Sequence, residues 1–114
     1  MTEELSAEDR KLVTLARATR ARTGAAEGAA VRDSDGRTYA AATVALPSLA
    51  VSAVGVCVAM AISSGSAGLE AVVVLTDAAE VAESDLAAVR DLAGPGVVVH
   101  LGDARGTVTA TTTS

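Results

Sequence analysis

The sequence predicts an α/β fold in which helices cover a mixed β-sheet of four to five strands. Two apolar runs rich in β-branched residues, LEAVVVLTD (69–77) and GVVVHLGD (96–103), are typical of strands buried on both faces. Between them lies ESDLAAVRDLAG (83–94), whose leucines and valine recur at helical spacing. Because strand, helix and strand in this order form a right-handed crossover, we expect the two strands to pair in parallel.

The N-terminal segment predicts an amphipathic helix over residues 7–22. Ser6 can cap its first turn with Asp9 at the third position, and Gly24 ends it. Its apolar face is formed by Leu12, Leu15, Ala16 and Thr19. The basic residues lie mostly on other faces, where they could form a nucleic-acid-binding surface or an ordinary solvated face. Acidic residues on the same helix favour the solvated face.

Residues 28–44 predict two short antiparallel strands joined at DSDGR. Asp35-Gly36 is a hairpin signal, because glycine supplies the positive φ that a tight turn requires. The acidic pair Asp33 and Asp35 lacks the further oxygen ligands of a calcium loop. We therefore interpret this pair as part of the turn.

No charged residue occurs from Thr38 to Leu69, so this run has to be tested as a membrane span. Its content of alanine, serine and glycine and the interruption at Pro47 argue against a span. Within the run, residues 48–64 predict a helix that starts at Pro47 and Ser48. Because this helix is apolar on all sides, we expect it to be buried on all sides.

The predicted order is helix, two strands, helix, strand, helix, strand, with GTVTATTTS after the last strand. A chain of 114 residues is one domain by size. We expect that domain to span residues 1–105. Residues 106–114 are expected to form either a C-terminal edge strand or a disordered tail.

The composition predicts a self-associating protein. Half of the residues are hydrophobic, but they are mostly Ala and Val, and Tyr39 is the one aromatic residue. Small side chains bury little area each, so we expect additional burial between subunits, in a homodimer or homotetramer. The net charge of −5 argues against a nucleic-acid partner, and we expect no membrane partner. One cysteine fits a reducing compartment, which predicts a cytoplasmic location.

Residues that commonly carry catalysis are few. The single histidine, His100, stands in an apolar strand, where histidine is typically a core or interface side chain. Cys57 stands between Val56 and Val58, which predicts an inert, buried thiol with a raised pKa. The sequence contains no Cys-x-x-Cys pair, no phosphate-binding glycine loop of recognised spacing and no nucleophile-elbow serine.

Four acidic residues follow the strand 69–77, where an α/β sheet tends to place its ligand crevice. They are Asp77, Glu80, Glu83 and Asp85. These side chains could bind a cation or a hydroxyl ligand. Alternatively, they complement the positive end of the helix that follows.

The order of elements and the segments EGAAVRDSDGRTYAAATV (27–44) and AISSGSAGLEAVVVLTD (61–77) resemble the cytidine deaminase family over about residues 8–104. The resemblance implies a three-layer α-β-α fold. It also implies a zinc site built from a Cys/His-Ala-Glu segment and a Pro-Cys-x-x-Cys segment. Family members associate as dimers and tetramers through the central helix, which implies an interface here at Val51, Val54, Val58 and Ile62.

The working residues of the family do not recur at the matching positions. The ribose-binding Asn-x-Glu segment corresponds to Thr43-Val44-Ala45, and the Cys/His-Ala-Glu segment falls near Val54-Gly55-Val56. The Pro-Cys-x-x-Cys segment falls within Glu83–Ala88, which has no cysteine. We therefore expect no catalytic residue, no zinc ligand and no cofactor. A residual crevice is expected at Thr43, Ala45, Asp77, Glu80, Glu83 and Asp85.

Three hypotheses about function follow from these observations. The first is a zinc-less, catalytically inactive cytidine deaminase-like protein that acts as a self-associating binding or assembly module. The second is an active hydrolase of the nucleoside deaminase type, with a site remade from Asp77, Glu80 or Asp85 or completed by another subunit. The third is a regulatory partner protein that uses the basic helix face. The sequence does not name a small-molecule ligand or a protein partner.

Overall fold

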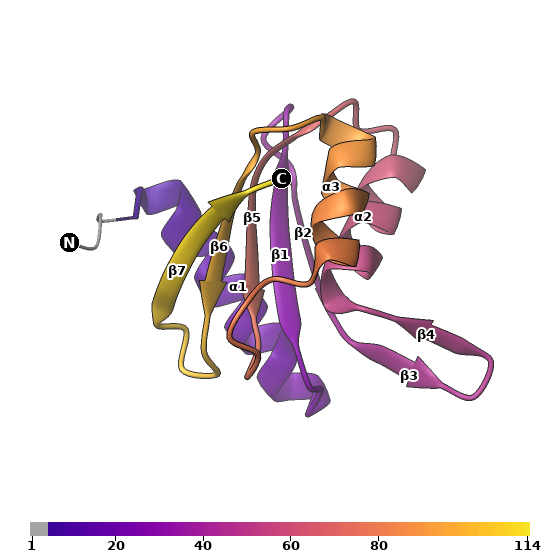
Figure 1. Cartoon of the computed structure of the whole chain (residues 1–114), viewed down its shortest axis with the longest axis vertical. Coiled ribbons are helices and arrows are strands. Elements are labelled where there is room, and N and C mark those ends of the chain that lie inside the picture. The colour runs from indigo at the N-terminus through magenta and orange to yellow at the C-terminus, as the bar shows by residue number, and fades with distance from the viewer. Residues whose placement is uncertain (1–4) are drawn as a thin grey trace.

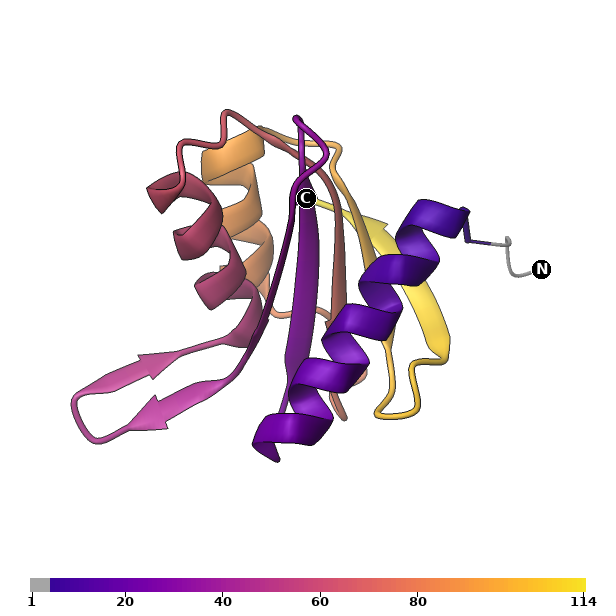
Figure 2. The same cartoon turned by 180° about the vertical axis from the view of Figure 1, so that it is seen from behind.

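The computed structural model describes residues 5–114, which fold into three layers. A five-stranded sheet is the middle layer, with α1 on one face and α2 and α3 on the other (Figures 1 and 2). The predicted three-layer α/β architecture is confirmed. In chain order the elements are α1 (Ala7–Thr23), β1 (Gly28–Asp33), β2 (Thr38–Ala42), β3 (Val44–Leu46), β4 (Leu49–Val51), α2 (Ala53–Ser63), β5 (Leu69–Leu75), α3 (Glu83–Ala93), β6 (Val98–Gly102) and β7 (Val108–Thr113).

The sheet is mixed, with the strand order β2-β1-β5-β6-β7. β1 pairs antiparallel with β2 and with β5, and β7 pairs antiparallel with β6 along one edge. The pair β5 and β6 is parallel, and α3 forms its crossover connection, as predicted. Because β5 and β6 run in the same direction, their carboxyl ends lie at one edge of the sheet, and α3 begins at this edge (Figure 1).

Helix α1 has the predicted ends. The Oγ of Ser6 accepts a hydrogen bond from the backbone N–H of Asp9 at 3.1 Å. Gly24 ends the helix with a φ of 64°, a left-handed conformation that glycine adopts without steric cost. The helix lies close to β1 because Gly28 has no side chain: a Cβ there would lie 2.4 Å from the carbonyl oxygen of Ala16.

The predicted helix over 48–64 is wrong at its start. Residues 44–51 form a second hairpin, in which β3 pairs with β4 around a turn at Pro47-Ser48, and α2 begins at Ala53. The fixed φ of proline suits a β-turn as well as the first turn of a helix, so this sequence signal has two solutions. The hairpin extends away from the three layers (Figures 1 and 2).

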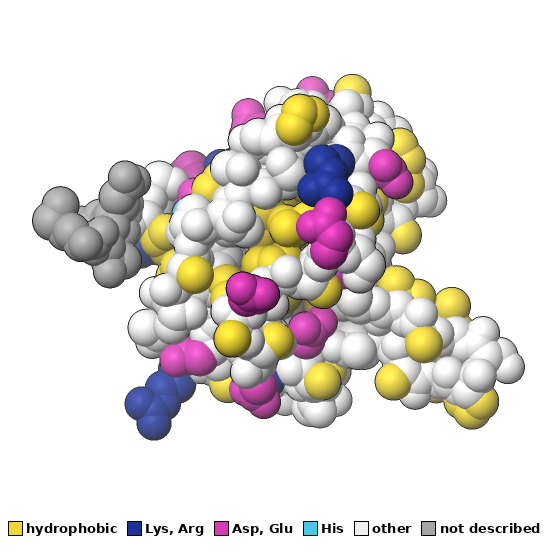
Figure 3. Space-filling view, viewed as in Figure 1, with side chains coloured by type: hydrophobic (Ala, Val, Ile, Leu, Met, Phe, Trp, Pro, Cys, Tyr) yellow, Lys and Arg dark blue, Asp and Glu magenta, His cyan; other side chains and the backbone are white. Residues whose placement is uncertain are grey.

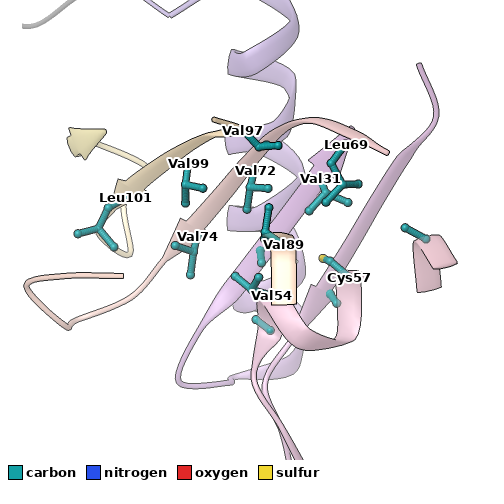
Figure 4. Close-up of a cluster of buried hydrophobic side chains, with 14 residues drawn as sticks. Val31, Val54, Cys57, Leu69, Val72, Val74, Val89, Val97, Val99 and Leu101 are labelled. Carbon is teal, nitrogen blue, oxygen red and sulfur yellow. The ribbon is translucent and has the colours of Figure 1, made fainter. Parts of the chain in front are cut away.

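Two hydrophobic cores flank the sheet, and β5 contributes to both. Val72 and Val74 face the α2 and α3 layer, where Figure 4 shows them beside Val54 and Val89. The opposite face of β5 is buried against α1 through Ala71, Val73 and Leu75. This strand is therefore buried on both faces, as its continuous apolar run predicts.

Helix α2 is buried on one side only within the single chain. Val54 and Cys57 lie in the core, whereas the side chain of Ile62 is 57% exposed. The expected burial on all sides is therefore not met by residues 5–114 of one chain, in which the sheet and α3 cover the inward side of the helix. None of the helices in residues 5–114 is both long enough and apolar enough to cross a membrane.

Candidate functional site

The N-termini of α2 and α3 lie together on one face of the sheet and are joined by a side-chain hydrogen bond (Figure 1). Ser52, which precedes α2, donates its hydroxyl hydrogen to Oδ1 of Asp85 in the first turn of α3, with an O···O distance of 2.6 Å. The same Oγ accepts a hydrogen bond from the backbone N–H of Gly55 at 3.0 Å and so caps α2. Asp85 is 5% exposed, so this carboxylate is nearly withdrawn from water.

Asp85 lies beside the N-termini of two helices. A helix N-terminus carries unpaired N–H groups and a partial positive charge. α2 has no acidic residue in its own first turn, and the N-cap residue of α3, Ala82, makes no side-chain cap. Asp85 therefore places one carboxylate in the first turn of α3 and, through Ser52, at the cap of α2.

The two segments at which the resemblance places zinc ligands meet in this region. Val54-Gly55-Val56 lies in the first turn of α2, and Glu83–Ala88 covers the first part of α3. Val54 offers only an aliphatic side chain, and Glu83 is exposed and paired with Arg90. The polar groups that remain are the half-buried Ser52 hydroxyl and the buried Asp85 carboxylate, which bond to each other. Such a pair does not fit the three or four nitrogen, sulfur or carboxylate ligands of a zinc site.

The histidine and the cysteine lie elsewhere. Cys57 points into the core, with its Sγ 3.7 Å from the carbonyl oxygen of Tyr39, and burial raises the pKa of its thiol to about 12. His100 lies on the α1 side of the sheet and bonds to Asp9 at 2.9 Å and to Thr111 at 3.0 Å. Both are buried, as the sequence predicts. Within residues 5–114 no three His, Cys, Asp or Glu side chains gather closely enough to hold a metal ion.

The acidic residues of the expected crevice separate into three places. Asp77 is exposed and lies 3.5 Å from the guanidinium of Arg20 on α1, and Asp85 bonds to Ser52. Glu80 and Glu83 line an open hollow of about 420 Å³ beside α3, over an apolar floor (Figure 3). The apolar residues that line this hollow include Leu86, Leu101 and Ala110.

Neither of the two non-acidic residues of the expected crevice lines that hollow. Thr43 accepts a hydrogen bond from the backbone N–H of Glu27 at 2.9 Å and follows β2 directly. Ala45 lies in β3, where it is exposed on the protruding hairpin. The hydroxyl of Thr43 is therefore engaged in fixing the chain before β1.

The residues expected at a subunit interface differ in accessibility. Val51 and Val58 are half-buried, and Ile62 is exposed. Val54 is 1% exposed and packs in the core of the chain itself, so its side chain is not accessible on the surface of the single chain. Val54 lies in the first turn of α2, on the side of the helix that faces β5 and α3 (Figure 4).

Sequence reasoning missed Ser52 as a functional residue. Its signal is present, since Ser52 directly precedes the apolar helical run and is a favoured N-cap type. The serine at position 48 offers the same signal four residues earlier. The second partner of Ser52, Asp85, is 33 residues away in sequence, and only the folded chain brings the two together.

Comparisons with known proteins give a consistent result. A family model described as "Cytidine deaminase-like" matches residues 5–106. The fold is similar to the crystal structure of a cytidine deaminase from Burkholderia pseudomallei, with 20% identity, a TM-score of 0.79 and coverage of 95% of this chain and 92% of that chain. It is also similar to a cytidine deaminase from Mycobacterium leprae, with 19% identity, a TM-score of 0.73 and coverage of 95% and 94%. No curated protein matches the sequence. Since the family model spans nearly the whole chain, this protein belongs to the cytidine deaminase-like family.

Proposed function

We propose that this protein is a zinc-less member of the family that does not deaminate nucleosides and acts as a self-associating assembly module in the cytoplasm. The observation that carries the proposal is the chemistry at the two helix N-termini. Aliphatic residues and one Ser52–Asp85 hydrogen bond stand where metal ligands and a proton-transferring glutamate would be needed. Hydrolytic deamination requires both a metal that generates hydroxide near neutral pH and a carboxylate that moves protons.

The zinc-less part of the proposal is tested by metal analysis and an activity assay. Elemental analysis of the purified protein should find no stoichiometric zinc, and cytidine absorbance should not decay in its presence. One zinc per chain, or cytidine turnover that is lost on chelation, would overturn the proposal. The assay needs an authentic cytidine deaminase as a positive control.

The assembly part of the proposal rests on an apolar surface that one chain leaves uncovered. Leu46 and Leu49 on the β3–β4 hairpin are 60% and 53% exposed, and Ile62 on α2 is 57% exposed. No charged residue lies between Thr38 and Leu69 to solvate this region. Exposed large apolar side chains of this kind are typical of interaction surfaces, and a second copy of this chain carries the same exposed side chains.

A charge on this surface should disrupt the assembly. We expect Ile62→Glu and Leu49→Glu to shift the mass measured by light scattering from oligomer to monomer, with the circular dichroism spectrum retained. Ala21→Glu, at an exposed position of α1, is the matched control and should leave the mass unchanged. A wild-type protein that is monomeric throughout would refute the assembly proposal.

One observation favours an active hydrolase as a second candidate. The hollow beside α3 combines an apolar floor with the carboxylates of Glu80 and Glu83, and it is large enough for a small organic molecule. If this hollow were a remodelled active site, the wild-type protein would turn over a member of a nucleoside panel and Glu80→Gln would abolish that turnover. Turnover that survives this substitution would exclude the hollow as the active site.

A further inference from the structure

We infer that the Ser52–Asp85 hydrogen bond fastens α2 to α3 in the place where the family fold would use a metal ion. This inference rests on the zinc-less function proposed above. A zinc ion held by ligands from two helices fixes both helix ends. Here the two ends are joined by a hydroxyl and a carboxylate, 2.6 Å apart.

The geometry favours a strong bond. Hydrogen bonds to an ionised acceptor are shorter than neutral ones, and a length of 2.6 Å falls in the range for a hydroxyl donating to a carboxylate. Asp85 is 5% exposed, so water competes little for the acceptor. Ser52 is also held from its other side, because its Oγ accepts from the N–H of Gly55 while it donates to Asp85.

The packing of α2 and α3 explains why a hydrogen bond between the two helices would matter for stability. The part of α2 that faces inward consists of small side chains, namely Ala53, Val54, Cys57 and Ala61, which bury little area. On α3 only Val89 among the apolar residues is fully buried. Among the side-chain hydrogen bonds of residues 5–114, the bond between Ser52 and Asp85 is the one that joins these two helices.

The Gly55 position supports the same interpretation. A Cβ at Gly55 would lie 3.0 Å from the Ser52 Oγ and 3.0 Å from a methyl carbon of Val51. A side chain would therefore press on the hydroxyl that makes both bonds. Glycine, a poor helix former, leaves the Ser52 Oγ free to lie between the N–H of residue 55 and the carboxylate of Asp85.

A simpler alternative is that Asp85 acts only on the dipole of its own helix, as acidic residues in a first turn commonly do. The two explanations predict different coupling. An effect on the α3 dipole does not depend on Ser52, whereas a fastening between helices requires both side chains.

A double-mutant cycle decides between the two explanations. The variants are Ser52→Ala, Asp85→Ala and the double variant, and the measurement is urea unfolding followed by circular dichroism at one protein concentration. Each single change should lower the folding equilibrium constant by about tenfold or more, because one partner of a partly buried hydrogen bond is left unpaired. In the double variant, the folding equilibrium constant should fall by a factor much smaller than the product of the two single-variant factors.

Matched controls keep the test decisive if a truncation unfolds the chain. Glu83→Ala removes the other acidic residue of the first turn of α3, and it should show no coupling to Ser52→Ala. Asp85→Asn keeps the shape and one acceptor oxygen but removes the charge. It should fold, lose part of the stability, and remain coupled to Ser52→Ala.

The outcomes separate this inference from the proposed function. In one outcome, the double variant lowers the folding equilibrium constant by the full product of the two single-variant factors, in protein shown to be free of metal. That result would overturn the inferred link between α2 and α3 and leave the zinc-less proposal standing. Zinc bound at one per chain would overturn the zinc-less proposal whatever the coupling between Ser52 and Asp85.

Discussion

Asp33 shows how a single buried charge is stabilised in this chain. Its Oδ1 accepts hydrogen bonds from the backbone N–H groups of Asp35 at 3.0 Å and Arg37 at 2.9 Å. Its Oδ2 accepts from the hydroxyls of Ser66 at 2.5 Å and Tyr39 at 3.2 Å. The bond from Ser66 and those from the turn outweigh burial and lower the pKa of Asp33. The carboxylate therefore ties the β1–β2 turn to the segment that precedes β5.

The first prediction concerns acid stability. Because the pKa of Asp33 is lower in the folded chain, its stabilisation is complete above the unfolded value of about 3.9 and is lost as the pH falls through the folded value. The urea midpoint of the wild type should therefore fall steeply below about pH 4. Asp33→Asn should be less stable at pH 7 and show a shallower acid dependence. An unchanged acid slope in this variant would contradict the prediction.

Asp9 contributes a second component to the same acid dependence. Burial alone would raise the pKa of Asp9, but hydrogen bonds from His100 and Arg32 and their charges lower it overall. Some loss of stability in acid should therefore persist in Asp33→Asn. A further substitution, Asp9→Asn, should remove this remainder.

The second prediction concerns Cys57. Its thiol is buried, and its pKa of about 12 keeps it protonated at neutral pH. A thiol reagent added to the native protein at pH 7 should react slowly, and the reaction should become fast in denaturant. Labelling of the native protein as fast as that of the unfolded chain would contradict this assignment to the core.

At the scale of elements, the contact between α1 and β1 depends on Gly28. A Cβ at this position would lie 2.4 Å from the carbonyl oxygen of Ala16 and 2.7 Å from the Cβ of Arg20. Gly28→Ala should therefore destabilise the chain by about 1–3 kcal/mol, because helix and strand must move apart. Urea unfolding measures this loss.

Gly68 provides the control for this third prediction. Its φ is not positive, and the nearest atom to an added Cβ is the Ser34 Oγ at 3.8 Å. Gly68→Ala should be neutral or slightly stabilising, because alanine restricts the unfolded chain. Equal losses in the two variants would show that the close approach at Gly28 does not determine stability.

The elements also show what sequence alone can and cannot predict. The β1–β2 turn follows from Asp35-Gly36, and the buried strands β5 and β6 follow from continuous β-branched runs, because these signals are local. The start of α2 is not determined by a local sequence signal. The segment around Pro47 fits either a helix start or a hairpin turn, and the choice depends on β3–β4 pairing and on the distant Asp85.

At the scale of the whole molecule, small side chains limit the stability of a single chain. Among residues 5–114 the largest fully buried side chains include two leucines, Leu12 and Leu75, and the others are mostly valines. Composition predicts this modest core, which is why we propose burial between subunits. It cannot predict which apolar side chains stay exposed, because the exposure of Leu46, Leu49 and Ile62 is set only by how the chain folds.

The fourth prediction is that stability depends on protein concentration. If folded chains associate through the hairpin and α2, mass action raises the apparent stability of the assembled state. The thermal midpoint of the wild type should rise with each tenfold increase in concentration, and Ile62→Glu should remove this dependence. Val54→Glu should instead unfold the chain at every concentration, because it places a charge in the core. A wild-type midpoint that is independent of concentration would argue against assembly.

The protruding hairpin links local folding of residues 44–51 to assembly of the chains. A two-stranded ribbon with no layer packed on it is only marginally stable in water. The backbone amides of residues 44–51 should therefore open and exchange with solvent far more readily than those of β5, and become protected when a neighbouring chain covers them. Local ordering of this ribbon and recognition of a neighbour would then be one coupled event. Residues 44–51 would then become ordered together with assembly, which would make the assembled state more cooperative than the single chain.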